Sequence, residues 1–63
     1  MSELEGYGEK DRARIKVLAR EFIVVQIQRG DIDGTSESIQ ASLPVAFRDA
    51  KATIYAVDKI IYG

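Results

Sequence analysis

The 63-residue sequence contains no cysteine and no histidine. Without cysteine the chain has no disulfide to stabilise it, and without either residue it lacks the usual ligands of a structural zinc site. A chain of this length buries only about 60% of the surface that its unfolded form exposes, so the core of a monomer is marginal. Small proteins that lack disulfides and metals are often stabilised by oligomerisation, and we expect the same here.

The sequence also lacks a strong net charge and a long apolar run. Nine Lys and Arg residues stand against ten Asp and Glu residues, and the formal net charge of -1 gives no general attraction to nucleic acid or anionic membranes. No apolar run approaches the ~20 residues needed to span a bilayer. The first ten residues, MSELEGYGEK, are acidic and do not resemble a signal peptide. We therefore expect a cytoplasmic protein with no membrane partner.

The missing histidine and cysteine also restrict catalysis. Nucleophilic and general-base chemistry would depend on carboxylates or lysines. No pair of acidic residues falls on an apolar helix face, where burial would raise the pKa values of the pair. We therefore predict that the protein is not an enzyme and that it needs no cofactor or metal ion.

An apolar run at residues 15–27, IKVLAREFIVVQI, dominates what is present. It lies in a segment that we predict to be helical from about residue 9 to residue 29. The main apolar stripe of this helix follows steps of three and four residues: Ile15, Leu18, Phe22 and Val25. At about 100° per residue, three further apolar residues fall on nearly the opposite side, and they are Ala13, Val17 and Val24.

Residues 22–28 also carry a competing signal for a β-strand. They are rich in β-branched residues, and Val25 to Gln28 alternate as a strand does. A single strand needs a partner, however, and no other segment has a strand pattern. Arg29 followed by Gly30 is a typical helix end, so we prefer a helix over these residues.

Residues 31–35 read Asp-Ile-Asp-Gly-Thr. This DxDGT motif resembles the signature of haloacid dehalogenase-type phosphatases, in which the first aspartate attacks phosphorus and the second handles the proton. That family places the motif at the end of a buried strand in a large α/β domain, and too little chain follows here to build one. The segment also resembles the start of an EF-hand calcium loop, but Ser36 and Ser42 replace its Gly and its bidentate Glu. We interpret it as a turn with an N-cap at Thr35.

The rest of the chain is predicted to form two helices, separated at a proline. A short helix spans about residues 36–42, and Leu43 before Pro44 is expected to leave the helical region and end it. A long helix then runs over about residues 45–62. Its apolar seam has alternating steps of four and three residues: Leu43, Phe47, Ala50, Ile54, Val57 and Ile61.

The predicted fold is therefore all-α, with a flexible lead-in at residues 1–8 and one helical domain at residues 9–63. Two long helices joined by a connection of about a dozen residues pack as an antiparallel hairpin. The second apolar face of the first helix then has no partner in its own chain. We expect a homodimer that closes as a four-helix bundle, since two-fold pairing is the commonest oligomer.

These patterns predict a small non-enzymatic module that acts through protein–protein contacts, with itself and with a further protein as partners. The expected oligomer interface consists of Ala13, Val17, Val24, Tyr55 and Tyr62. The alternative is a small dimeric DNA-binding regulator that uses the basic helix faces between Lys10 and Arg20. The residues expected to contact nucleic acid in that case are Arg12, Lys16 and Arg20.

Overall fold

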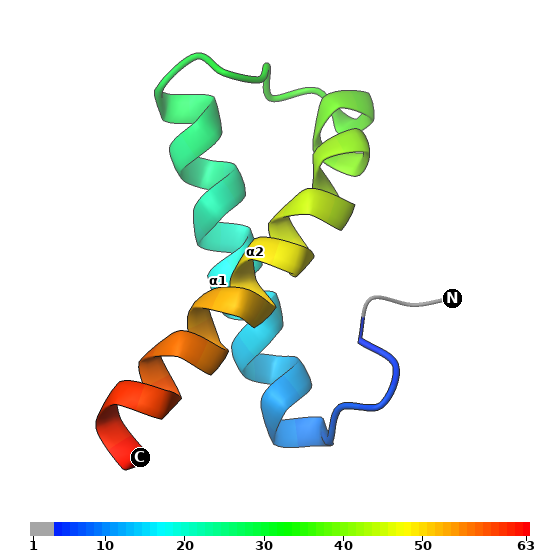
Figure 1. The fold of residues 1–63 in the computed structure, drawn as a ribbon. Helices are drawn as coiled ribbons and strands as arrows, with labels where there is room; N and C mark the ends of the chain where they lie inside the picture. The colour runs from blue at the N-terminus through cyan, green and yellow to red at the C-terminus, as the bar shows by residue number, and fades with distance from the viewer. Residues whose placement is uncertain (1–3) are drawn as a thin grey trace.

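A computed structural model of the chain describes residues 4–63. Within that range the protein has two helices, α1 at Glu9–Gln28 and α2 at Ser36–Tyr62, and no strand. The helices pack against each other as a helical hairpin, run in opposite senses and cross near their middles (Figure 1). The all-α prediction is confirmed, and residues 22–28 are helical as preferred. Neither helix of the described range is long and apolar enough to cross a membrane.

The end of α1 is set by Gly30, as the sequence predicts. Gly30 has φ +79°, a left-handed conformation that glycine adopts without steric cost. Its N–H donates to the carbonyl of Ile27 at 3.1 Å, and the next N–H, of Asp31, donates to the carbonyl of Gln26 at 2.9 Å. These two bonds form a Schellman motif, which satisfies carbonyls left open at the helix end.

The start of α2 is capped by Thr35, which confirms the predicted N-cap. The backbone N–H of Ser38 donates to Thr35 Oγ1 at 3.2 Å. Asp33 supports the cap from the preceding turn, because its Oδ1 accepts from the Thr35 hydroxyl and from the Thr35 N–H. The DxDGT segment is therefore a turn and a helix cap in the structure.

The prediction of a separate short helix at 36–42 is wrong. α2 is continuous through Pro44, so residues 36–42 form its first turns rather than a helix of their own. Pro44 has no N–H to donate to the carbonyl four residues earlier, and its ring crowds that carbonyl, at a cost of about 3 kcal/mol. Ile39 and Leu43 before the proline and Phe47 after it all pack against the core, which holds both parts in one helix. The helix changes direction along this part of its course (Figure 1).

The core is small and lies where the two helices cross. Within residues 4–63 it consists of buried apolar side chains from both helices and the lead-in: Leu4, Ile15, Ala19, Ile23, Ala46 and Ala50. On α1 the buried residues follow four-residue steps, and so do the two alanines of α2. Packing between such rows crosses helices at about 50°, whereas the alternating seam of a coiled coil gives about 20°. Alanines at the crossing allow the two backbones to approach closely.

This crossing changes the expected pattern of burial. On α1, Ile23 is buried while Val25 of the expected stripe is exposed. On α2, Ala50 is fully buried, but Val57 and Ile61 of the expected seam are exposed because the helices diverge after the crossing. The seam was inferred from heptad spacing, which assumes a shallow angle between the helices.

The described part of the lead-in, residues 4–8, contacts the helices. Leu4 is buried in the core, and Arg12 Nε donates to the carbonyl of Tyr7 at 2.9 Å. The Lys51 ammonium lies 6.0 Å from the centre of the Tyr7 ring. Residues 1–3 of the predicted lead-in lie outside the described residues.

Candidate interaction surface

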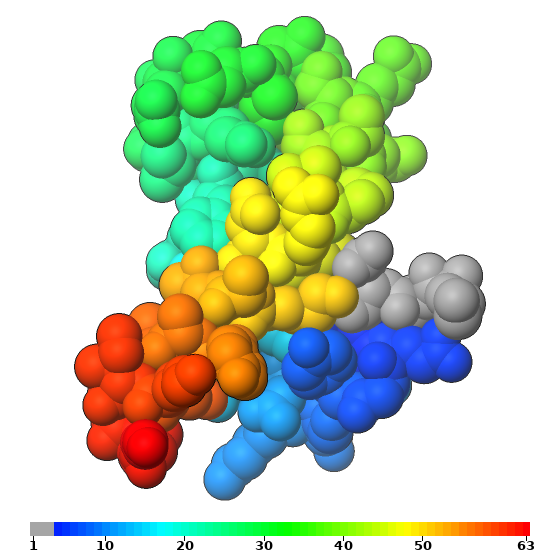
Figure 2. Space-filling model, viewed as in Figure 1, coloured from blue at the N-terminus to red at the C-terminus, as the bar shows by residue number. Residues whose placement is uncertain are grey.

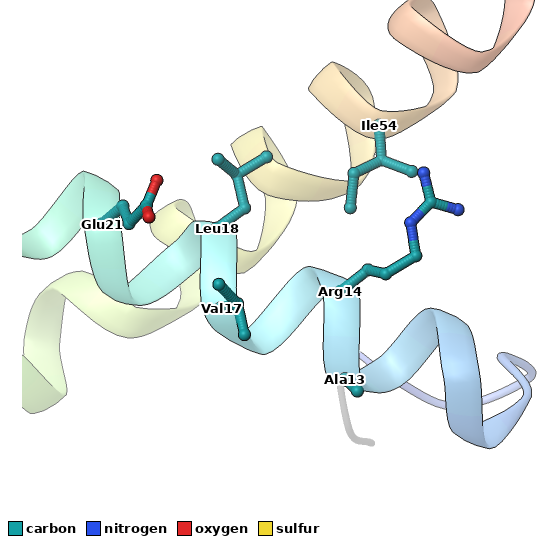
Figure 3. Close-up of a pocket in the computed structure, with 6 residues that line it drawn as sticks. All are labelled: Ala13, Arg14, Val17, Leu18, Glu21 and Ile54. Carbon is teal, nitrogen blue, oxygen red and sulfur yellow. The ribbon is translucent and has the colours of Figure 1, made fainter.

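One side of α1 carries apolar residues that the fold leaves uncovered. We call this side the outer face and define it by Ala13, Val17, Arg20, Glu21 and Val24. At 100° per residue it lies on the far side of α1 from the buried row. Val17 is 60% exposed and Val24 is 41% exposed. In Figure 3, Leu18 and Arg14 extend from α1 toward α2, whereas Ala13 and Val17 are turned away from it.

Two shallow hollows adjoin at the outer face, and the first extends from it to Ile54 of α2. The first has a volume of about 410 Å³ and is lined by Ala13, Arg14, Val17, Leu18, Glu21 and Ile54 (Figure 3). The second has a volume of about 350 Å³ and is lined by Arg20, Glu21, Val24 and Val25. Glu21 lines both, so the outer face offers an uneven apolar surface into which side chains of another helix can fit.

Within the described residues, the charged side chains of the outer face lack ion-pair partners, whereas Arg14 beside the face has them. Arg14 forms two hydrogen bonds with Asp58, at 2.8 and 3.2 Å, and a weaker contact with Asp11 at 3.4 Å. The hydrogen bond and charge of Asp58 raise the pKa of Arg14. By contrast, neither Arg20 nor Glu21 has an ion-pair or hydrogen-bond partner for its side chain within residues 4–63.

The structure divides the five predicted interface residues between separate surfaces. Ala13, Val17 and Val24 share the outer face of α1. Tyr55 instead lines a hollow of about 160 Å³ together with Tyr7 and residues of both helices. Tyr62 is 82% exposed in the last turn of α2.

The last turns of α2 form an exposed apolar end that the sequence pattern did not indicate. Ile60 is 84% exposed and Ile61 is 64% exposed. The heptad spacing assigns Ile61 to the apolar seam between the helices. Its exposure follows from the angle at which the helices cross, which the spacing does not give. Figure 2 shows this end of the chain projecting at one edge of the molecule.

The three residues predicted to contact nucleic acid are all exposed, but they have different surroundings. Arg12 is bound to the carbonyl of Tyr7 near the start of α1. Lys16 and Arg20 border an apolar hollow of about 300 Å³ between the second half of α1 and the first half of α2, and Val24 of the outer face lines it as well. The structure therefore places two of the three at the rim of an apolar surface.

The Asp31–Thr35 turn is held by hydrogen bonds among its own side chains and the start of α2. Hydrogen bonds from the Ser38 and Thr35 hydroxyls and from the Thr35 N–H hold the pKa of Asp33 below its usual value. Asp31 lies 3.8 Å from Arg29, measured from Oδ2 to Nε. Among residues 4–63 there is no group of three or more His, Cys, Asp or Glu side chains placed to hold a metal ion. The carboxylate of Asp33 thus serves the helix cap.

Comparison with protein-family models, with curated proteins and with solved structures finds no match to this chain. The feature that the surface offers is an apolar helix side flanked by charges of both signs.

Proposed function

We propose that the protein is a small non-enzymatic interaction module that acts as a homo-oligomer, and that its basic unit is a homodimer closing as a four-helix bundle. The observation that carries this proposal is the exposed outer face of α1, with Val17 and Val24 in the open. Exposed apolar side chains that share one helix side and are rimmed by charges are typical of a contact site. A second copy of the hairpin supplies the layer that the first copy lacks, with the two α1 helices in contact at the centre of the bundle and each α2 on the outside.

The exposed area supports the same conclusion. The chain has an accessible surface of 4928 Å². A folded monomer of 7.0 kDa is expected to expose about 4000 Å². The difference of about 900 Å² is close to the ~800 Å² that each partner buries in an interface of standard size.

The shape of the hairpin agrees with the area. Its Cα extents are 37 × 25 × 14 Å and its radius of gyration is 12.5 Å. A compact domain of this length is expected to have a radius of gyration of about 11 Å. The hairpin is thus a thin slab only two helices deep, and stacking two slabs gives the proportions of an ordinary domain.

Sedimentation equilibrium tests the proposal. The wild type should have a mass near 14 kDa at micromolar concentration, that is, about twice the 7.0 kDa of the chain. Val17→Glu and Val24→Glu each place a charge in the contact and should lower the mass toward that of the monomer, or unfold the chain where the monomer is too unstable. A wild-type mass of 7.0 kDa across this range would reject the proposal.

A matched control is available on the opposite helix. Val45 is 44% exposed, much like Val24, and at 100° per residue it lies on the side of α2 away from the buried alanines. Val45→Glu introduces the same charge at the same exposure and should leave the mass unchanged. Loss of mass in this variant as well would show that the contact includes α2 in addition to α1.

A further inference from the structure

We propose that the two copies in this dimer contact each other through their α1 outer faces. The two α1 helices are parallel, and the two-fold axis lies between them and runs in the same direction. Arg20 of each copy then pairs with Glu21 of the other. This inference rests on the proposed homodimer and specifies its geometry. It is carried by the positions of four residues that surround the centre of the outer face: Val17, Arg20, Glu21 and Val24.

Helix geometry places these four residues as a diamond. Val17 and Val24 are seven residues apart, so they lie nearly on one line along the helix and about 10.5 Å from each other along its axis. Arg20 and Glu21 are successive residues, so they point about 100° apart. Each therefore occupies one flank of the line that joins the two valines.

The direction of α1 in the second copy determines which flanks of the two α1 helices face each other. In a parallel two-fold pair, opposite flanks face each other, so Arg20 lies against Glu21 of the second copy on both sides of the contact. In an antiparallel two-fold pair, equal flanks face each other, so Arg20 would meet Arg20 and Glu21 would meet Glu21. Like charges placed opposite one another are destabilising, so Arg20 and Glu21 favour the parallel pair. Lys10, seven residues before Val17 on the same line, also meets Lys10 of the second copy in that pair, and the proposal is that the two Arg20–Glu21 pairs outweigh this one repulsion in the exposed first turn of α1.

The same charges favour a second copy as the occupant of this face. Both side chains are exposed, and within residues 4–63 neither is held by another charged group. A face that carries one cation and one anion on opposite flanks is complementary to its own image about a parallel axis. The second copy also covers the valines, since Val17 then packs on Val17 and Val24 on Val24.

Disulfide trapping tests this geometry, because the chain has no cysteine of its own. In the parallel pair, Val17→Cys alone and Val24→Cys alone each form a disulfide-linked dimer under mild oxidation. In an antiparallel pair, residue 17 faces residue 24, and equal positions are separated by about 10.5 Å along the axis, beyond the reach of a disulfide. Only a mixture of the two variants would then be trapped efficiently.

The outcomes separate the two proposals. A dimeric mass together with trapping of each single variant supports the parallel pair. A dimeric mass with trapping only in the mixture, or with none, overturns the parallel geometry and leaves the dimer intact. A monomeric mass would remove the dimer and this inference together.

Charge reversal gives a second, independent measurement. Arg20→Glu and Glu21→Arg each bring like charges together and should weaken dimerisation at low salt by about tenfold or more. The double variant Arg20→Glu/Glu21→Arg restores both pairs and should dimerise like the wild type. Arg48→Glu serves as the control, since Arg48 is exposed on α2 beside Asp49, at 3.7 Å, and should have no effect. Single variants that dimerise as the wild type does would overturn the inference.

Discussion

Arg14 of α1 and Asp58 of α2 are joined by two hydrogen bonds, although they lie 44 residues apart in the sequence. The pair links the helices on the far side of the crossing from the loop. The two side chains keep 47% and 35% of their surface exposed, so water and salt screen the charges.

The first prediction concerns this pair. Asp58→Asn should lower the free energy of unfolding only slightly, as expected for an exposed ion pair, and the loss should shrink in high salt. Urea denaturation at low and high ionic strength measures both effects. Asp49→Asn is the control, because Asp49 forms an exposed ion pair within its own helix, with Arg48 at 3.7 Å. A loss that does not change with salt would show that Asp58 acts through packing.

The second prediction concerns Ile15, which is 1% exposed at the centre of the core. Ile15→Ala should lower the free energy of unfolding by ~2–5 kcal/mol, since it removes buried methyl groups and leaves a cavity. Ile61→Ala makes the same change on the exposed end of α2 and should cost far less. Denaturant midpoints at one fixed protein concentration give the comparison, because dimerisation adds to stability. Equal midpoints for the two variants would contradict the core as described.

The third prediction concerns the crossing itself. Ala50 is fully buried where the helices are closest, so Ala50→Leu should destabilise the fold by ~1–3 kcal/mol through overpacking. Ala52→Leu, two residues along at an exposed position, should change stability little. Thermal melts of both variants separate the effects. Equal melting temperatures would mean that the crossing can open without cost.

The fourth prediction is a pH dependence at the α2 cap. The pKa of Asp33 is lowered in the folded chain by the Ser38 and Thr35 hydrogen bonds, so its contribution to stability is present above the pKa of a free aspartate, about 3.9. It is lost as the pH falls through the lower, folded value. Asp33→Asn should therefore reduce the melting temperature near pH 6 and approach the wild type at acidic pH. A difference that stays constant across that range would exclude titration of Asp33 as the cause.

The fifth prediction addresses the DNA-binding alternative. If Arg12, Lys16 and Arg20 contact DNA, affinity for a labelled duplex should fall steeply between low and moderate salt. We expect instead no binding at tens of micromolar protein, since the formal net charge is -1 and the structure places Lys16 and Arg20 beside an apolar hollow. Salt-dependent binding that is lost in Lys16→Ala would favour the alternative.

The sequence predicts the helix ends better than the way the helices pack. Gly30 and Thr35 act through their own backbone and hydroxyl, so their roles are readable from local sequence. The helix break expected before Pro44 does not occur, because packing of Leu43 and Phe47 on the core overrides the local preference of the proline. Such contacts join residues that are distant in the sequence, so local sequence patterns do not predict them.

The candidate site could be predicted only in part. The opposite placement of Val17 and Val24 follows from helical spacing, and their exposure on a single hairpin is confirmed. Grouping them with Tyr55 and Tyr62 required the relative orientation of the two helices, which spacing does not give. That the outer face binds a second copy remains a prediction.

The small core at the crossing has a consequence for how the molecule opens. Ala19, Ala46 and Ala50 are buried at the crossing, and beyond it the helices separate toward their ends (Figure 1), although Arg14 and Asp58 still join them. Backbone hydrogen bonds near that point are protected by the whole fold, whereas those of the last turns of α2 depend mainly on their own helix. Amide exchange should slow toward the crossing and quicken toward the helix ends. We therefore expect the last turns of α2 to unfold locally while the crossing of the two helices stays folded.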